Sequence, residues 1–202
     1  MLPNTLTALL QMLPMLPRPL GSGTYAANET TLVLKRGALS SDSDAMIMDT
    51  AGIPRLLLVR RRALYDRYRA SSPLSAGPTP DITDATGTVL YSLTENHLTF
   101  GRGIVGSDRA RALRLYVRRV WGDAKAIAAT VEHNGTTHSI QLQGCMDSAT
   151  LILEDGSPVA RLRTYCKDFG APRGSICLTI APGVDIALAA VLALAFDECS
   201  WY

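Results

Sequence analysis

The closing stretch, APGVDIALAAVLALAFDECSWY, contains eleven consecutive residues without a polar side chain, from Ile186 to Phe196. A helix that crosses a membrane needs about 20 apolar residues, and eleven helical residues cover only about 17 Å. Asp185 precedes the run, and Asp197 with Glu198 follows it. A longer span would place these charges in lipid. We therefore expect an element buried in protein rather than a transmembrane anchor.

Four segments upstream share one pattern, in which a Gly-containing turn with an acidic or Asn residue separates two runs of alternating apolar residues. Glycine supplies the positive φ that a tight hairpin needs, and Asn134-Gly135 is a candidate for a type I′ turn. The segment 110–122 fits either a helix or a strand, and its Val and Tyr favour a strand. The four predicted hairpins are 46–58, 81–93, 130–142 and 151–163. An antiparallel, mostly β domain follows.

The apolar run predicts a helix, and a helix that is apolar on every side must be surrounded by protein. Five alanines keep this helix thin. A helix that covered one face of a sheet would show a polar side, and this one has none. Together with the many antiparallel strands, this predicts a closed barrel with the helix threaded through it as the core.

The chain of 202 residues is expected to hold one domain, 30–202, after an extended Pro-rich arm, 1–29. The arm has no basic residue before Arg18, and prolines interrupt it, so it fits a signal peptide poorly. The four cysteines are far apart, without a metal-type or scaffold-type spacing. Free thiols are the plain interpretation, and a cytoplasmic location follows, with peripheral attachment to a membrane left open.

Three segments, 30–52, 155–164 and 181–198, resemble the LURP-one-related family of the tubby C-terminal-like superfamily. The resemblance implies a closed antiparallel twelve-stranded β-barrel around a central, buried C-terminal α-helix, with no enzymatic activity. Plant members are connected with defence. Related branches bind phosphoinositides or associate with phospholipid membranes, but this chain lacks the scramblase calcium-loop pattern and the tubby-type ending. No binding residue of those branches can therefore be transferred to it.

Basic residues concentrate in two parts of the chain. Seven lie between Arg102 and Lys125, against two aspartates, and an Arg triplet follows the apolar run LLLV. Guanidinium groups grip phosphate with two parallel hydrogen bonds. Solvated strand ends are the plainer interpretation, and a site for a lipid headgroup is the functional one. The candidate residues for lipid or phosphate binding are Arg60, Arg61, Arg62, Arg114, Arg118 and Arg119.

Other chemistry finds little support in the sequence. His133 and His138 flank the Asn-Gly turn without a Cys or acidic partner close by, which is a weak signal for a metal. No motif pairs a nucleophile with a base, so we expect no catalytic residue, metal or cofactor. The leading hypothesis is a non-enzymatic domain that binds acidic phospholipid headgroups or acts as an adaptor. A protein-interaction or structural module is the alternative, an enzyme with an unrecognised site is the third, and nucleic acid is not an expected partner.

Overall fold

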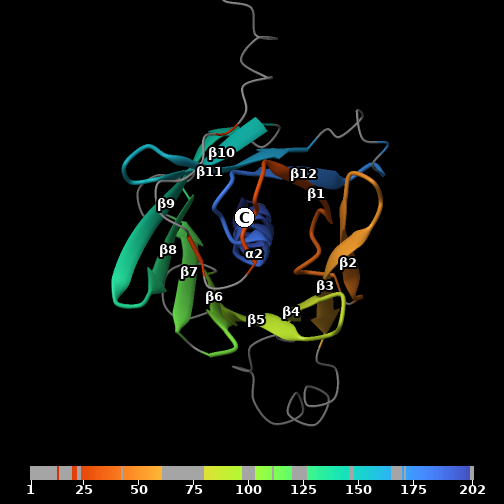
Figure 1. Ribbon diagram of the computed structural model, residues 1–202, viewed down its shortest axis with the longest axis horizontal. Helices are drawn as coiled ribbons and strands as arrows, with labels where there is room; N and C mark the ends of the chain where they lie inside the picture. The colour runs from red at the N-terminus through yellow and green to blue at the C-terminus, as the bar shows by residue number, and fades with distance from the viewer. Residues whose placement is uncertain are drawn as a thin grey trace, which may run out of the picture.

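Twelve antiparallel strands form a closed barrel around one helix in the computed structural model (Figure 1). Each strand pairs with the next along the chain, and β1 closes the ring by pairing with β12. The strands are β1 Thr30–Lys35, β2 Ala45–Asp49, β3 Pro54–Arg60, β4 Pro80–Asp84, β5 Val89–Asn96, β6 Gly103–Asp108, β7 Leu113–Arg119, β8 Ile127–His133, β9 Thr136–Cys145, β10 Ser148–Leu153, β11 Pro158–Arg163 and β12 Ser175–Ile180. The helix is α2, Ile186–Ser200. The described residues are 13, 20–21, 24–41, 43–60, 80–96, 103–110, 112–119, 127–145, 148–164, 170 and 172–200.

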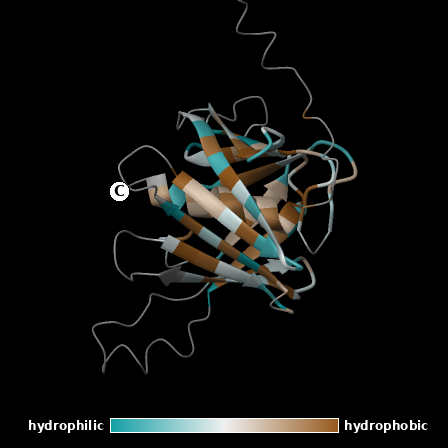
Figure 2. Ribbon diagram, turned by 90° about the vertical axis from the view of Figure 1, so that its left-hand side faces the viewer, coloured by the Kyte–Doolittle hydropathy of each residue, from teal (hydrophilic) through white to brown (hydrophobic). Residues whose placement is uncertain are grey.

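The core of the barrel is the helix itself. Every described side chain of α2 after Ile186 is buried, and the helix packs against β1, β5, β7, β8, β11 and β12. The strands supply the other half of the core by alternation, because successive side chains of a strand point to opposite faces. In β7, for example, Leu113, Leu115 and Val117 are at most 1% exposed. Figure 2 shows this alternation as bands of hydropathy along the strands.

The sequence-based predictions of the fold are confirmed. The four predicted hairpins are β2–β3, β4–β5, β8–β9 and β10–β11, and the ambiguous segment 110–122 contains the strand β7. Asn134 and Gly135 both have positive φ, of 49° and 75°, as a type I′ turn requires. No helix among the described residues combines the length and apolar character needed to cross a membrane.

The two ends of the barrel differ, and each is named here by a buried aspartate. Helix α2 starts at the Asp185 end and stops at the Asp197 end. Because the chain runs up and down, the odd-numbered strands also run from the Asp185 end to the Asp197 end. The even-numbered strands run the opposite way. This direction decides at which end each loop, and each charged residue at a strand end, is placed.

Tight hairpins turn at the Asp185 end, and in three of them an aspartate accepts hydrogen bonds within the turn: Asp49, Asp84 and Asp155. The amide of Ile53 donates to Asp49 Oδ1 at 2.9 Å, and this hydrogen bond holds the pKa of that carboxyl below its ordinary value. Asp84 repeats the arrangement, where the hydroxyl and amide of Thr86 donate to Oδ1 and lower the pKa of that carboxyl. The three carboxylates are accordingly part of the turns.

The described residues 20–21 and 24–26, which we call the strap, lie across the Asp185 end (Figure 1). The Leu20 amide donates to Gly183 O at 3.1 Å, and the Asp185 amide donates back to Leu20 O at 2.9 Å. The Ile186 amide, which has no partner within its own helix, donates to Thr24 O at 3.0 Å. The described part of the predicted arm is thus hydrogen-bonded to the segment that starts α2.

Gly21 lets the strap approach the helix start closely. Its φ is +115°, and a Cβ added there would lie 2.3 Å from Cβ of Asp185. Other residues rarely adopt that backbone conformation, and no side chain fits at that distance. Asp185 itself is completely buried and accepts hydrogen bonds from the amides of Ala187 (2.9 Å) and Leu188 (3.2 Å). It is therefore the N-cap of α2.

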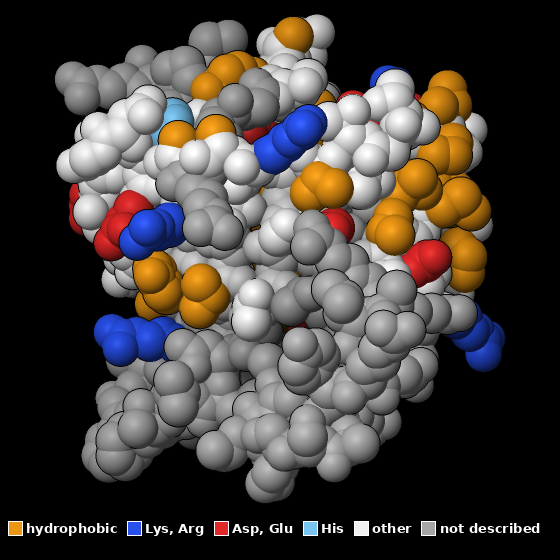
Figure 3. Space-filling view, turned by 90° about the horizontal axis from the view of Figure 1, so that it is seen from below, with side chains coloured by type: hydrophobic (Ala, Val, Ile, Leu, Met, Phe, Trp, Pro, Cys, Tyr) orange, Lys and Arg blue, Asp and Glu red, His pale blue; other side chains and the backbone are white. Residues whose placement is uncertain are grey.

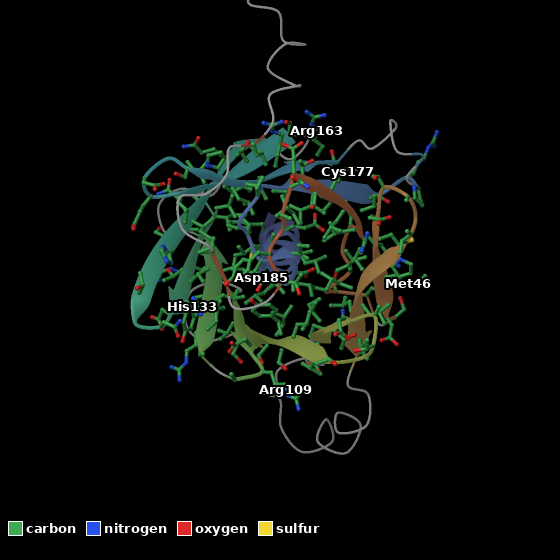
Figure 4. The ribbon with its side chains drawn as sticks, viewed as in Figure 1. Met46, Arg109, His133, Arg163, Cys177 and Asp185 are labelled. Carbon is green, nitrogen blue, oxygen red and sulfur yellow. The ribbon has the colours of Figure 1, made fainter. Side chains whose placement is uncertain are left out.

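The prediction of four free thiols is wrong for Cys177, which is disulfide-bonded. Its partner lies outside the described residues. Cys177 faces outward on β12, where it contacts Val33 and pairs in register with Arg163 of β11 (Figure 4). Cys199, near the end of α2, is free and buried.

Candidate functional site

Arg60 ends β3 at the Asp197 end, but its side chain points into the barrel. It is 8% exposed, and its guanidinium donates to the backbone oxygens of Ala38 (2.7 Å) and Leu39. Its amide donates to Asp44 Oδ1 at 2.8 Å. These contacts hold the loop that joins β1 to β2. The contacts of Arg60 therefore stabilise the fold, and we do not count this residue among the candidates for ligand binding.

The other members of the predicted set fall into two groups. Arg61 and Arg62 lie outside the described residues. Arg114 and Arg118 are exposed on the outer face of β7, and the side chain of Arg119 lies outside the described part. Since β3 and β7 are four strands apart, about 19 Å separates them along the wall. One small ligand cannot touch both strands, whereas a broad surface can.

The outer face of β7 alternates in register between two arginines and an aromatic ring, Arg114, Tyr116 and Arg118. Tyr116 is 40% exposed, which is unusual for so large an apolar body. Its cross-strand neighbours are small, Val105 on β6 and Thr130 on β8. Arg118 likewise has small neighbours, Gly103 and Ala128, whereas Arg114 lies between Ser107 and Glu132. We call these three side chains the β7 stripe.

The ends of the strands show a second regularity. Several strands that stop at the Asp197 end do so on a basic residue, and several that stop at the Asp185 end do so on an aspartate. The basic strand ends are Lys35, Arg60, Arg119 and Arg163, and the acidic ones are Asp49, Asp84 and Asp108. Charge is therefore polarised along the barrel axis, with the basic side where α2 stops. The sequence contained this signal, but reading it required the strand directions.

A hollow of about 640 Å³ lies beside the β7 stripe, over the outer face of β5 and β6. Short side chains form its floor: Ser92 pairs in register with Ser107, and Thr94 pairs with Val105. Arg109 stands at its edge, exposed and on the outside of the barrel (Figure 4). The hollow exists because short residues lie between longer ones. Sequence reasoning missed it, since Ser and Thr in a strand carry no signal of their own.

The two histidines are not directly opposite each other. His133, labelled in Figure 4, pairs in register with Thr136, and His138 pairs with Val131, so the two are diagonal neighbours across the hairpin. Within the described ranges, no group of three or more His, Cys, Asp or Glu residues is placed to hold a metal ion. The histidines therefore give no support to a metal site.

Comparison with known proteins identifies the family. The family model described as LURP-one-related matches residues 30–197, which is most of the chain. The chain belongs to the LURP-one-related family. Membership is consistent with the tubby-like barrel around a C-terminal helix that the resemblance implied.

A solved structure similar to this family member is that of a protein from Arabidopsis thaliana. The two share 18% sequence identity with a TM-score of 0.57, over 86% of this chain and 93% of the Arabidopsis chain. At this identity the likeness concerns the fold alone. A search of curated proteins finds no match to the sequence.

Proposed function

We propose that this LURP-one-related protein is a non-enzymatic domain that binds the acidic surface of a phospholipid membrane. The observation that carries the proposal is the polarity of charge along the barrel, with basic strand ends at the Asp197 end. Arg118 and Arg119 lie at this end, whereas Arg114, the second residue of β7, lies near the Asp185 end. A surface, unlike a single headgroup, can engage basic residues on strands far apart around the ring.

The magnitudes fit a peripheral and reversible contact. Each Lys or Arg near an acidic membrane contributes about 1 kcal/mol, and this attraction falls off within about one Debye length. Three or four such residues give about 3–4 kcal/mol, which is enough for membrane association in low salt and too little for permanent attachment. The acidic Asp185 end would then face away from the membrane, because like charges repel.

Arg118 at the Asp197 end of β7 offers a mutational test of this proposal. In Arg118→Gln, the loss of one charge should weaken partitioning onto acidic vesicles by about fivefold, which corresponds to about 1 kcal/mol. The Arg118 side chain is exposed, so the fold should be kept. Vesicle co-flotation with phosphatidylcholine vesicles containing phosphatidylserine measures the effect.

Arg55→Gln is the matched control for the vesicle experiment. Arg55 is 57% exposed on β3, near the Asp185 end, and forms an ion pair with Asp49 at 2.9 Å. Its removal also lowers the net charge by one but should leave flotation nearly unchanged. If Arg118→Gln floats as the wild-type protein does, Arg118 is not part of a membrane-binding surface.

A different face of the barrel favours a second candidate function, that of a protein-interaction module. Hydrophobic side chains gather on the outside of β2 and β3, at the right of Figure 3. Met46 is 56% exposed there, and Ile53 in the adjoining turn is 52% exposed. The charges nearby, Arg55 and Asp49, neutralise each other, which suits an apolar protein segment better than an acidic membrane. A saturable protein partner that Met46→Glu abolishes, while Arg114→Gln/Arg118→Gln is harmless, would favour this function.

A further inference from the structure

We propose that the hollow over β5 and β6 binds a small hydroxylated ring that carries one anionic group, such as a sugar phosphate. The inference rests on the proposed function only in taking an anion as the ligand. It concerns a discrete site toward the Asp185 end, whereas membrane binding concerns the basic Asp197 end. The ring could come from a free metabolite or from a lipid headgroup, and the chemistry of recognition is the same.

The register places the recognising groups in a grid on the outer wall. One row across β5, β6 and β7 consists of Ser92, Ser107 and Arg114, and the next row consists of Thr94, Val105 and Tyr116. Outward side chains in directly paired positions lie about 5 Å apart. Each row is therefore continuous from the hydroxyl groups of the hollow to the β7 stripe.

Each part of the grid suits one part of the ligand. The serine and threonine hydroxyls can donate to and accept from ring hydroxyls, and the Ser92 hydroxyl is oriented by its hydrogen bond to Asp81 Oδ1 at 2.7 Å. Val105 and the Tyr116 ring offer apolar surface against which the C–H groups of the ligand's ring can pack. Arg109 at the edge and Arg114 beside Ser107 supply guanidinium groups for the anion.

The size and charge of the hollow narrow the class of ligand. A volume of about 640 Å³ lies within the usual range for small-molecule sites, about 300–1,000 Å³. Much of the lining is polar but uncharged, which disfavours a purely apolar ligand. The buried carboxylate of Asp108 accepts a hydrogen bond from the Leu113 amide at 3.0 Å. Arg109 is therefore the exposed charge of the lining. Its single positive charge favours a ligand that carries few negative charges.

Calorimetric titration of the full chain with glucose 6-phosphate, glucose and inorganic phosphate tests the site. We expect glucose 6-phosphate to bind with a Kd below about 1 mM, and the other two to bind at least about tenfold more weakly. Arg109→Gln should weaken binding of glucose 6-phosphate by at least about tenfold, because a charge-assisted hydrogen bond is lost. Ser107→Leu should abolish binding by replacing a hydroxyl of the floor with a bulkier apolar side chain, and Arg173→Gln, exposed at the other end of the barrel, is the control.

A vesicle arm separates the two sources of the ring. Phosphatidylinositol and phosphatidylserine both carry one net negative charge, but only the first carries a hydroxylated ring. Preference for phosphatidylinositol vesicles, lost in Ser107→Leu, would support the site with a lipid as the source. Binding of glucose 6-phosphate without that preference would support the site with a free ligand as the source.

Three results would overturn the inference. The first is absence of both glucose 6-phosphate binding and a preference for phosphatidylinositol. The second is inorganic phosphate binding as tightly as glucose 6-phosphate. The third is binding by Ser107→Leu and Arg109→Gln equal to that of the wild-type protein. Equal flotation with both acidic lipids, without glucose 6-phosphate binding, would refute the hollow and leave the proposed membrane function standing.

Discussion

Leu192→Asp should leave the chain unable to fold. Leu192 lies in the middle of α2 and is completely buried, so the new carboxylate would be inside the barrel without water. Burying an unpaired charge costs several kcal/mol, which is a large part of the 5–15 kcal/mol that stabilises a typical domain. We expect insoluble protein, or a soluble chain without a cooperative thermal transition by circular dichroism.

Leu192→Met provides the control for this substitution. It keeps the volume and the apolar character, and it should cost less than about 1.5 kcal/mol. A soluble Leu192→Asp protein that melts cooperatively would contradict the threaded barrel, because the side chain would then have access to water. The comparison separates the effect of charge from the effect of merely altering a core residue.

Asp185→Ala should have the second-largest effect, about 3–4 kcal/mol. The carboxylate caps α2 through two backbone amides, and its Oδ2 accepts the hydroxyl proton of Tyr91 at 3.0 Å. Losing an N-cap costs about 1–2 kcal/mol, and a buried hydroxyl left without a partner costs about 1–3 kcal/mol more. Urea unfolding followed by fluorescence measures the free energy of unfolding.

Asp185→Asn is the informative companion to the alanine variant. Its side-chain oxygen can still accept from the helix amides, and its amide group can donate to the Tyr91 hydroxyl. We expect it to recover most of the stability, to within about 1 kcal/mol of the wild-type protein. Equal destabilisation by Asn and Ala would show that the capping geometry is not what Asp185 contributes.

The fold was largely predictable, because its determinants are local in sequence. The Gly-containing turns at 49–53, 84–88 and 153–158 and the alternating strands around them are patterns of a few residues. The apolar run from Ile186 needed only the argument that a helix without a polar side must be surrounded by protein. The count of twelve strands came instead from the family resemblance.

The site was less predictable, because it depends on which strands become neighbours and which side chains face outward. Arg60 and Arg118 both lie near the Asp197 end of a strand, yet one points into the barrel and the other away from it. A shift of one residue in a strand reverses the face. The strap was missed for a related reason, since its hydrogen bonds join segments far apart in sequence.

The most direct test of the proposed function is co-flotation of the wild-type protein with neutral and with acidic vesicles. Phosphatidylcholine vesicles with and without phosphatidylserine should be compared at low and at high ionic strength. We predict binding to the acidic vesicles alone, strong in low salt and largely lost near 1 M salt, where the Debye length falls to about 3 Å. Absence of binding to acidic vesicles in low salt, where electrostatic attraction is strongest, would contradict the account.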